Sequence, residues 1–403
     1  MTSRREFIRT LVAGSAAGML PGLTLAAPGS DHRRFVLVIL RGGLDGLAAV
    51  VPYGDPGYAG ARRGLALEPP VGSGGLRDLD GFFALHPMLA KLHGHYGRGE
   101  LIAAHAVAST YRRRSHFDAQ NVLELGLASP HASRQGWLNR ALPVLGTRTP
   151  GPSGDDAMAI GQAVPLVLRG PESVGSWSPA RLPGPDEDLM DRLLALYGSD
   201  AFLGPRLDAA LDADRMAGAG PAEHTRSGQQ FGQHFSKLAQ VAARMLRDET
   251  GPRIAVIEAG GWDTHANQGR ETGALAQRLR RLDEGLGGLA AGMGPGWRHT
   301  VVLVVTEFGR TVAMNGTRGT DHGTAGMALM LGGAVNGGRV VGDWPGLAPG
   351  RLHDGRDLAP TTDLRSIYKG ILRDHLGVSA ADLESRVFPS SRTAPAASGL
   401  IRS

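Results

Sequence analysis

The sequence contains no cysteine, which excludes disulfide bonds, thiolate metal sites and cysteine nucleophiles. It also carries little excess charge. The formal net charge is +5, and the first ten residues supply +2 of it through three arginines and one glutamate. The remaining +3 is scattered, which argues against a nucleic-acid partner. With 403 residues, of which 42% are hydrophobic and 20% charged, the chain has the composition of an ordinary globular protein with ample core.

The N-terminal segment has a composition of its own. Ser3–Thr10 reads SRREFIRT, and a weakly apolar stretch and the small residues TLAAPG follow it. This order is typical of the twin-arginine export signal, an address that the twin-arginine translocase reads and that is not part of the fold. The apolar stretch is too short to span a bilayer. We therefore expect residues 1–27 to be a signal peptide and the mature protein to be periplasmic or extracellular.

Apolar strand patterns alternate with helical patterns along most of the chain. The strands are expected at residues 35–40, 101–108, 253–261 and 299–311. Such alternation predicts an α/β fold with a mainly parallel central sheet and helices on both faces. We expect residues 28–403 to form a single domain. Residues 141–229 are rich in proline and glycine around one short amphipathic helix, which favours an insertion or lid, and the many glycines elsewhere indicate a loop-rich architecture.

Chemically active side chains follow the predicted strands. In chain order they are Asp45, Ser115, Asp263, His265 and Glu307, with Asp321 and His322 soon after. In open α/β sheets the ligand site lies beyond the carboxyl ends of the strands. Groups more than 270 residues apart in sequence would therefore converge on one rim.

Carboxylates and imidazoles without thiolates suit Zn²⁺, Mn²⁺ or, where oxygens dominate, Mg²⁺ and Ca²⁺. In GGWDTH, Asp263 and His265 are two residues apart and would point the same way from an extended backbone. In GTDHGTAG, Asp321 and His322 lie in a loop of glycine and threonine directly before an apolar run. We predict a divalent-metal site formed by Asp45, Asp263, His265, Glu307, Asp321 and His322.

Each of these motifs also has an ordinary explanation. A loop of glycine and threonine suits a solvated turn. Asp45, in RGGLDGL, could be a backbone acceptor within a glycine-rich turn, and Glu307 could pair with nearby Arg310.

Ser115, in RSHFD, is the candidate nucleophile. With Asp118 three residues later it also resembles a helix capping box. The two interpretations are compatible, because a helix N-terminus favours an alkoxide and binds tetrahedral oxyanions. Of the three arginines before it, which could equally be solvated, we expect one, Arg114, to bind a phosphate or sulfate group.

The leader and the motifs RGGLDGL, RSHFDAQ, GGWDTHANQ, TEFGRT and GTDHGTAG together resemble a bacterial exported family catalogued as domain of unknown function 1501. That family resembles the alkaline phosphatase and sulfatase superfamily, whose helix-covered, mainly parallel sheet carries two metals at its rim. The resemblance implies a nucleophile at Ser115 and metal ligands at Asp45, Asp263, His265, Glu307 and His322.

The chain departs from the superfamily at two places. Glu307-Phe308 stands where an Asp followed by His or Asn is usual, so one imidazole ligand is missing unless Asp321 or another group replaces it. The spacing between Asp263 and His265 is also shorter than usual. These departures allow two altered metals, one metal or none.

Two functions follow from these patterns. The first is a metal-dependent hydrolase of small-molecule phosphate or sulfate esters in the cell envelope. The alternative is a non-catalytic exported binding or assembly protein that keeps the fold with a degenerate metal site, and whose insertion serves a protein partner. Metal content separates the two.

Overall fold

The computed structural model describes residues 32–70, 75–146, 156–179, 187–197, 200–218 and 231–402. The expected signal peptide, residues 1–27, lies outside the described residues, as do parts of the segment 141–229. Residues from Asp31 onward form one compact unit. Among the described residues, no helix has both the length and the apolar character needed to cross a membrane.

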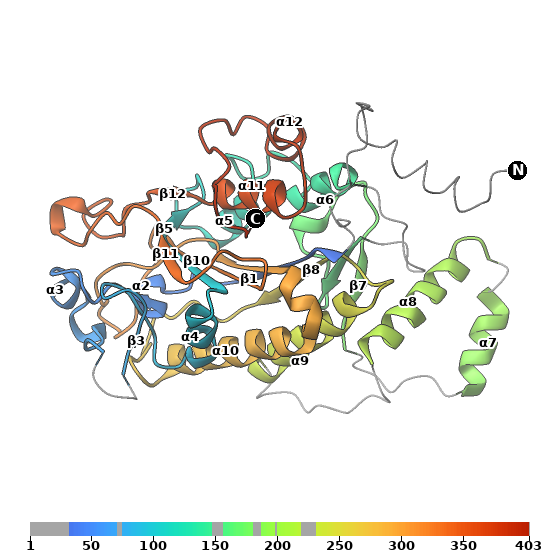
Figure 1. The fold of residues 1–403 in the computed structure, drawn as a ribbon, viewed down its shortest axis with the longest axis horizontal. Helices are drawn as coiled ribbons and strands as arrows, with labels where there is room; N and C mark the ends of the chain where they lie inside the picture. The colour runs from blue at the N-terminus through green and yellow to red at the C-terminus, as the bar shows by residue number, and fades with distance from the viewer. Residues whose placement is uncertain are drawn as a thin grey trace, which may run out of the picture. The chain divides into compact units, whose positions relative to one another are not determined.

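A nine-stranded sheet lies at the centre of this unit, in the order β11-β5-β10-β9-β1-β8-β6-β7, with β12 paired to β5 (Figure 1). The strands are β1 (Arg34–Leu40), β5 (Leu101–Ala108), β6 (Ala157–Ile160), β7 (Gly175–Trp177), β8 (Ile254–Ala259), β9 (Thr300–Thr306), β10 (Gly326–Leu331), β11 (Arg339–Val341) and β12 (Thr362–Asp363). β10 runs antiparallel to β5 and β9, whereas the other described pairs in this sheet are parallel. The predicted mainly parallel α/β architecture is confirmed.

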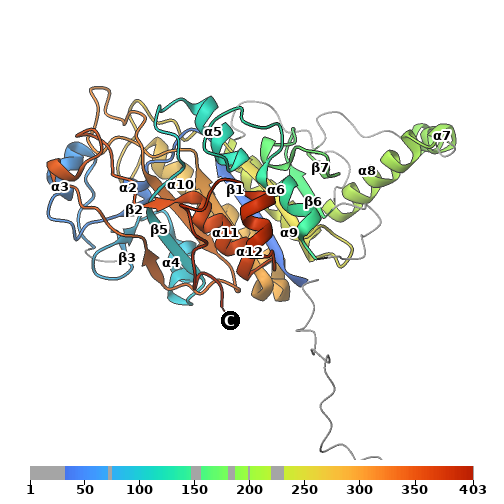
Figure 2. The same ribbon diagram turned by 90° about the horizontal axis from the view of Figure 1, so that it is seen from above.

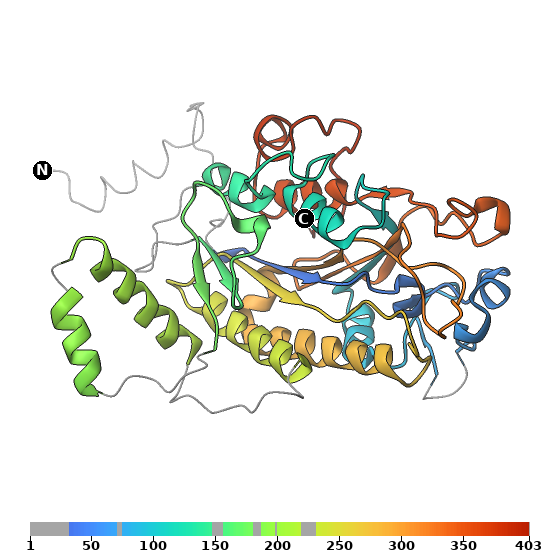
Figure 3. The ribbon, with the colours of Figure 1, turned by 180° about the vertical axis from the view of Figure 1, so that it is seen from behind.

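Helices cover both faces of the sheet, as Figure 3 shows. One face packs against α4 (Ala90–Gly97), α9 (Phe231–Arg247) and α10 (Ala274–Met293). The other packs against α5 (His116–Leu125), α6 (Trp137–Ala141) and α11 (Leu364–Asp374). In the view of Figure 2, α6 and α11 lie over the central strands.

The central strands are mostly apolar because both of their faces are buried. In β1, Val36 and Val38 face the α9 and α10 layer, while Phe35 and Leu37 face the opposite layer. All four are fully buried. Burying such a side chain contributes about 1.5–3 kcal/mol relative to leaving it exposed, so this sheet is a rigid platform for the loops at its edge.

Smaller elements flank the sheet. They are α2 (Gly46–Ala49), α3 (Tyr58–Arg62), α12 (Ala380–Asp382) and a three-stranded sheet of β2 (Val50–Val51), β4 (Ala84–Leu85) and β3 (Arg77–Asp78). Within the described residues of the segment 141–229 there are two α-helices, α7 (Glu187–Tyr197) and α8 (Leu203–Ala217), where the sequence predicted one. The same segment supplies β6 and β7 to the central sheet. These strands are only four and three residues long, too short for a period of two to identify them.

The antiparallel direction of β10 explains the location of the loop at residues 307–325. β9 ends at the carboxyl rim of the parallel strands, and an antiparallel β10 must begin at that same rim. The loop therefore runs along the rim without crossing the sheet, and an isolated bridge between Arg310 and His322 folds it back on itself. Residues just before the antiparallel strand β10 therefore lie at the same edge as residues that follow the parallel strands. This is the edge at which ligand sites of open α/β sheets lie.

Candidate metal centre

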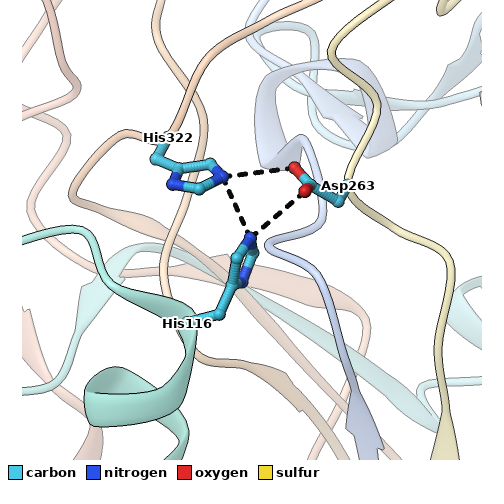
Figure 4. Close-up of side chains that lie close together, drawn as sticks. All are labelled: His116, Asp263 and His322. Atoms are coloured by element: carbon cyan, nitrogen blue, oxygen red, sulfur yellow. Dashed lines mark hydrogen bonds and ion pairs between the residues drawn. The ribbon is translucent and has the colours of Figure 1, made fainter.

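Three side chains from distant parts of the chain converge at the carboxyl rim (Figure 4). His116 is the first residue of α5, Asp263 follows β8, and His322 precedes β10. The Nε2 atoms of His116 and His322 are 2.9 Å apart. Each also lies 3.3 Å from an oxygen of Asp263, Oδ2 for His116 and Oδ1 for His322.

His265 adds a third imidazole beside this group. Its Nε2 lies 2.9 Å from Asp263 Oδ1 and 3.0 Å from His322 Nε2. The sequence predicted that the side chains of Asp263 and His265 would point the same way, and in the structure the two side chains are in contact. The buried guanidinium of Arg310 pairs with Asp263 and, although burial raises the pKa of this carboxyl, helps to hold that pKa below its usual value.

Each imidazole is held from behind by an acceptor at Nδ1. Glu307 Oε1 lies 2.7 Å from His116 Nδ1, and Asp321 Oδ1 lies 3.2 Å from His265 Nδ1. The carbonyl oxygen of Arg114 lies 2.9 Å from His322 Nδ1. A carbonyl or carboxylate only accepts, so Nδ1 must donate in each ring and Nε2 is left with its lone pair. This is the arrangement that metal-binding histidines adopt.

The facing Nε2 atoms of His116 and His322 provide a test of fit for a cation. Two lone pairs at 2.9 Å repel each other unless a proton or a metal ion lies between the rings. Hydrogen bonding to Glu307 raises the pKa of His116, whereas burial lowers the pKa of His322, so a proton would reside on His116. Three imidazoles and one carboxylate are also the donor types of zinc sites. The residues present therefore fit a divalent metal.

Glu307 is a support for His116 in this arrangement. The side chain is fully buried, and its Oε1 accepts from Gly42 N at 2.8 Å and Gln120 Nε2 at 2.9 Å as well as from His116. Burial raises the pKa of Glu307, but these hydrogen bonds outweigh it and hold the pKa below its usual value. The carboxylate is thus ionised and committed to its donors.

Asp321 has the same kind of role at a more exposed position. Its Oδ1 accepts from Asn315 Nδ2 at 2.9 Å and contacts His265. The Asn315 hydrogen bond is the main cause that lowers the pKa of Asp321. The opening glycine of GTDHGTAG, Gly319, packs against the backbone of His265, which accounts for the lack of bulk in this loop.

Asp45 lies apart from the three converging side chains. Only 1% of it is exposed, and its Oδ2 accepts from Arg62 Nη2 at 2.6 Å and from Gln268 Nε2 at 2.7 Å. The structure therefore brings together three of the six predicted ligands, Asp263, His265 and His322. It places Glu307 and Asp321 behind them and Asp45 in a buried ion pair.

Ser115 occupies the N-cap position of α5 with extended backbone angles, but its side chain makes no capping hydrogen bond. Asp118, the expected partner in a capping box, accepts from Tyr111 Oη at 2.9 Å instead. The hydroxyl therefore begins a helix directly beside His116 without being used as a cap.

Arg114 contributes through its backbone. Its guanidinium is paired with Asp354 and Asp357, each at 2.8 Å, so it is already neutralised. Its φ is +60°, a strained value for arginine, and its carbonyl holds His322. Arg113 is exposed and makes no hydrogen bond or ion pair with the residues that the structure describes.

His116 is the residue that the sequence reasoning missed. It follows Ser115 directly in RSHFD, a motif whose serine and aspartate also fit a capping box. The usable signal was its position in the first turn of a helix that starts at the rim, since such a residue points towards the same edge as the strand ends. Gln120, one turn later, reaches the same Glu307.

Comparisons with known proteins agree with the motifs. A family model described as "Protein of unknown function (DUF1501)" matches residues 32–387. No curated protein matches the chain.

The chain is also similar to several solved structures. A phosphonate monoester hydrolase of Agrobacterium radiobacter is 13% identical with a TM-score of 0.39, and the match covers 86% of this chain and 74% of that one. A sulfatase from Pseudoalteromonas sp. is 15% identical with a TM-score of 0.37, covering 92% and 74%. A lipoteichoic acid synthase from Listeria monocytogenes is 8% identical with a TM-score of 0.37, covering 91% and 77%. Likeness at this level does not identify an activity.

Proposed function

Because the chain belongs to the family described as protein of unknown function (DUF1501), a description that names no activity, we propose its function from the centre itself: a metal-dependent hydrolase of phosphate or sulfate esters. One observation carries the proposal. The Nε2 atoms of His116 and His322 converge with the carboxylate of Asp263 at the carboxyl rim of the sheet, His265 Nε2 lies 3.0 Å from His322 Nε2, and each of the three imidazoles is held at Nδ1 by an acceptor.

The chain's own residues divide the work. His116, His265, His322 and Asp263 would hold a divalent cation, with Zn²⁺, Mn²⁺, Mg²⁺ and Ca²⁺ as the candidates. A cation held there supplies the positive charge that polarises an ester oxygen and stabilises the charge that develops on it. Glu307, Asp321 and the Arg114 carbonyl fix the three rings, so little reorganisation is needed during the reaction.

Ser115 is the nucleophile in this proposal. Its hydroxyl is not used for capping, it neighbours His116, and it lies at the N-terminus of the ten-residue helix α5. The partial positive charge of that helix end favours an alkoxide and a bound oxyanion. Arg113 offers an exposed guanidinium two residues away for the anionic group, a role that we no longer assign to Arg114 because two carboxylates neutralise it.

We also propose that the substrate is a small-molecule ester and that the protein acts in the periplasm or outside the cell after export by the twin-arginine translocase. The SRREFIRT motif supports export. The alternative is an exported binding or assembly protein. It would keep the buried ion pair of Asp45 and Arg62 but would bind no divalent metal ion.

The test is elemental analysis of the mature protein, purified folded and without chelators, followed by a screen of aryl phosphates and aryl sulfates. We expect bound divalent metal and ester hydrolysis. His322→Ala should lose the metal, whereas His93→Ala, a histidine on α4, should keep it.

Ser115→Ala should abolish turnover and keep the metal. Since Ser115 makes no capping bond, this change should alter the free energy of unfolding by less than about 0.5 kcal/mol. Turnover that survives Ser115→Ala would remove the serine from the mechanism. A protein that neither contains nor takes up metal would contradict the proposal and favour the binding protein.

A further inference from the structure

We infer that the centre holds a single Zn²⁺ ion, bound by three imidazoles and Asp263, and that Arg62 closes Asp45 to a second ion. The inference rests on the proposed function, because it names the metal and the stoichiometry of the same site. The sequence allowed two metal ions, one or none at this site, and we infer one.

The pair of Arg62 and Asp45 is the first observation. Arg62 is fully buried at the end of α3, and its Nη2 lies 2.6 Å from Asp45 Oδ2. Its Nη1 donates to the carbonyl of Val312 at 3.0 Å, which fixes the guanidinium from a second side. Arginine keeps its charge in proteins. A cation that bound Asp45 would have to displace a permanent charge that has no route to water, and removing one partner of a buried pair is strongly unfavourable.

Gln268 also holds Asp45 in place. Its Nε2 donates to Asp45 Oδ2 at 2.7 Å. Its Oε1 accepts from Thr264 Oγ1 at 2.7 Å and from Thr320 Oγ1 at 2.9 Å. Both the nitrogen and the oxygen of the Gln268 amide are therefore hydrogen-bonded. The Asp45 carboxylate is held by Arg62 and Gln268, and further hydrogen bonds fix both of these side chains.

The other acidic candidates are also committed. Glu307 accepts from Gly42, Gln120 and His116, and Asp321 accepts from Asn315 and contacts His265. Asp263 is the one predicted acidic ligand whose carboxylate lies among the Nε2 atoms. With a single carboxylate at the centre, one oxygen of which also pairs with Arg310, the negative charge available there suits no more than one divalent ion.

The donor set indicates which metal this ion is. Mg²⁺ and Ca²⁺ prefer six or more oxygen ligands from carboxylates, carbonyls and water. Imidazole nitrogen favours zinc and its transition-metal neighbours. Imidazole nitrogens with one carboxylate are donor types of Zn²⁺, which can expand to five-coordinate and so admit an ester oxygen, and Mg²⁺ and Ca²⁺, which the sequence left open, are not expected here.

The experiment loads the mature protein with Zn²⁺, removes the excess by gel filtration and measures zinc per chain. X-ray absorption at the zinc edge counts the imidazole ligands. The matched variant is Asp45→Asn/Arg62→Gln, which removes both charges together and keeps amides that can hydrogen-bond, so that no unpaired buried charge is left. His116→Ala removes a proposed ligand.

We expect one zinc per chain with three imidazoles in the wild type and the same in the double variant, with an affinity changed by less than about threefold. His116→Ala should weaken zinc binding by about a hundredfold or more. A hundredfold excess of Mg²⁺ or Ca²⁺ should not displace the zinc. Two zinc ions per wild-type chain, or loss of zinc in the double variant, would overturn the inference while leaving a metal-dependent hydrolase in place. One zinc without any ester hydrolysis would instead leave the inference standing and remove the proposed function. No zinc would overturn the inference, whereas only the absence of every divalent metal would contradict the proposed function as well.

Discussion

At the scale of single residues, the acceptors behind the imidazoles matter as much as the ligands. Glu307 is the clearest case, because it is buried, ionised and 2.7 Å from His116 Nδ1. Its charge both fixes the tautomer of His116 and makes the ring a stronger donor to a metal. Asp321 does the same for His265, but its side chain is 53% exposed and the contact is 3.2 Å.

We predict that Glu307→Gln lowers zinc affinity by about 10–100-fold, because glutamine still accepts a hydrogen bond but carries no charge. Asp321→Asn should lower it by less than about tenfold, since water already screens this carboxylate. Competition with a chromogenic chelator measures both affinities, and a thermal melt in excess chelator checks that each variant folds. Equal losses in the two variants would show that burial of the acceptor is irrelevant.

Residue types and strand ends led to most of this site. Asp263, His265 and His322 could be predicted because they follow or border strands whose ends share a rim. The partners of Asp45 could not be predicted. Arg62 lies on a separate short helix, and no local pattern shows that its guanidinium turns inward to Val312 and Asp45. A buried charge pair of this kind is visible only in three dimensions.

At the scale of elements, the loop between β9 and β10 sets the distance between His265 and His322. Its segment 315–320 pairs with residues 264–268, as in the hydrogen bond from Thr320 N to Thr264 O at 3.1 Å. Gly319 is buried there, and a Cβ on it would lie 2.4 Å from the backbone of His265. Gly316, in the same loop, is exposed, and a Cβ on it would have nothing within 4 Å.

Gly319→Ala should therefore push the two segments apart, destabilise the fold by about 1–3 kcal/mol and lower zinc affinity by about tenfold or more. Gly316→Ala is the matched control and should change stability by less than about 0.5 kcal/mol and leave zinc binding unaltered. Urea unfolding and a zinc titration give the two quantities. If Gly319→Ala bound zinc normally, the packing of this loop would not position His265.

The sequence predicted a mainly parallel sheet, but not that β10 runs antiparallel to its neighbours. Met327–Leu331 reads as a buried strand, but nothing in an apolar run shows whether the strand is parallel or antiparallel to its neighbours. The connection of only 19 residues from Glu307 to Ala325 was the available sign. It holds no helix, and a crossover to a parallel strand usually requires one.

At the scale of the whole molecule, burial on both faces of the sheet encloses titratable groups that are not part of the candidate centre. His105 in β5 and His375 after α11 are 2% exposed. Burial lowers the pKa of each to about 4, although hydrogen bonds to the carbonyls of Val50 and Arg34 act in the opposite direction. Both rings are therefore neutral in the folded protein at neutral pH.

This burial predicts a loss of stability in mild acid. In the unfolded chain a histidine takes up a proton near pH 6.5, whereas in the folded protein these two remain neutral until about pH 4. Between these values the unfolded state binds more protons, so the free energy of unfolding falls as pH falls from 6.5 to 4. It should fall by an amount on the order of 3 kcal/mol for each ring, and level off for these groups below pH 4.

The measurement is urea unfolding at pH 7.5, 6, 5 and 4.5 in excess chelator, so that metal binding does not contribute. His375→Gln and His105→Gln should each be less stable than the wild type at pH 7.5, because the replacement disturbs the packing. The difference from the wild type should then shrink as pH falls, because the variant no longer has a buried ring to protonate. A difference that stays constant from pH 7.5 to 4.5 would mean that these rings accept protons without unfolding. Acid stability would then depend on other groups, such as the carboxylates at the rim.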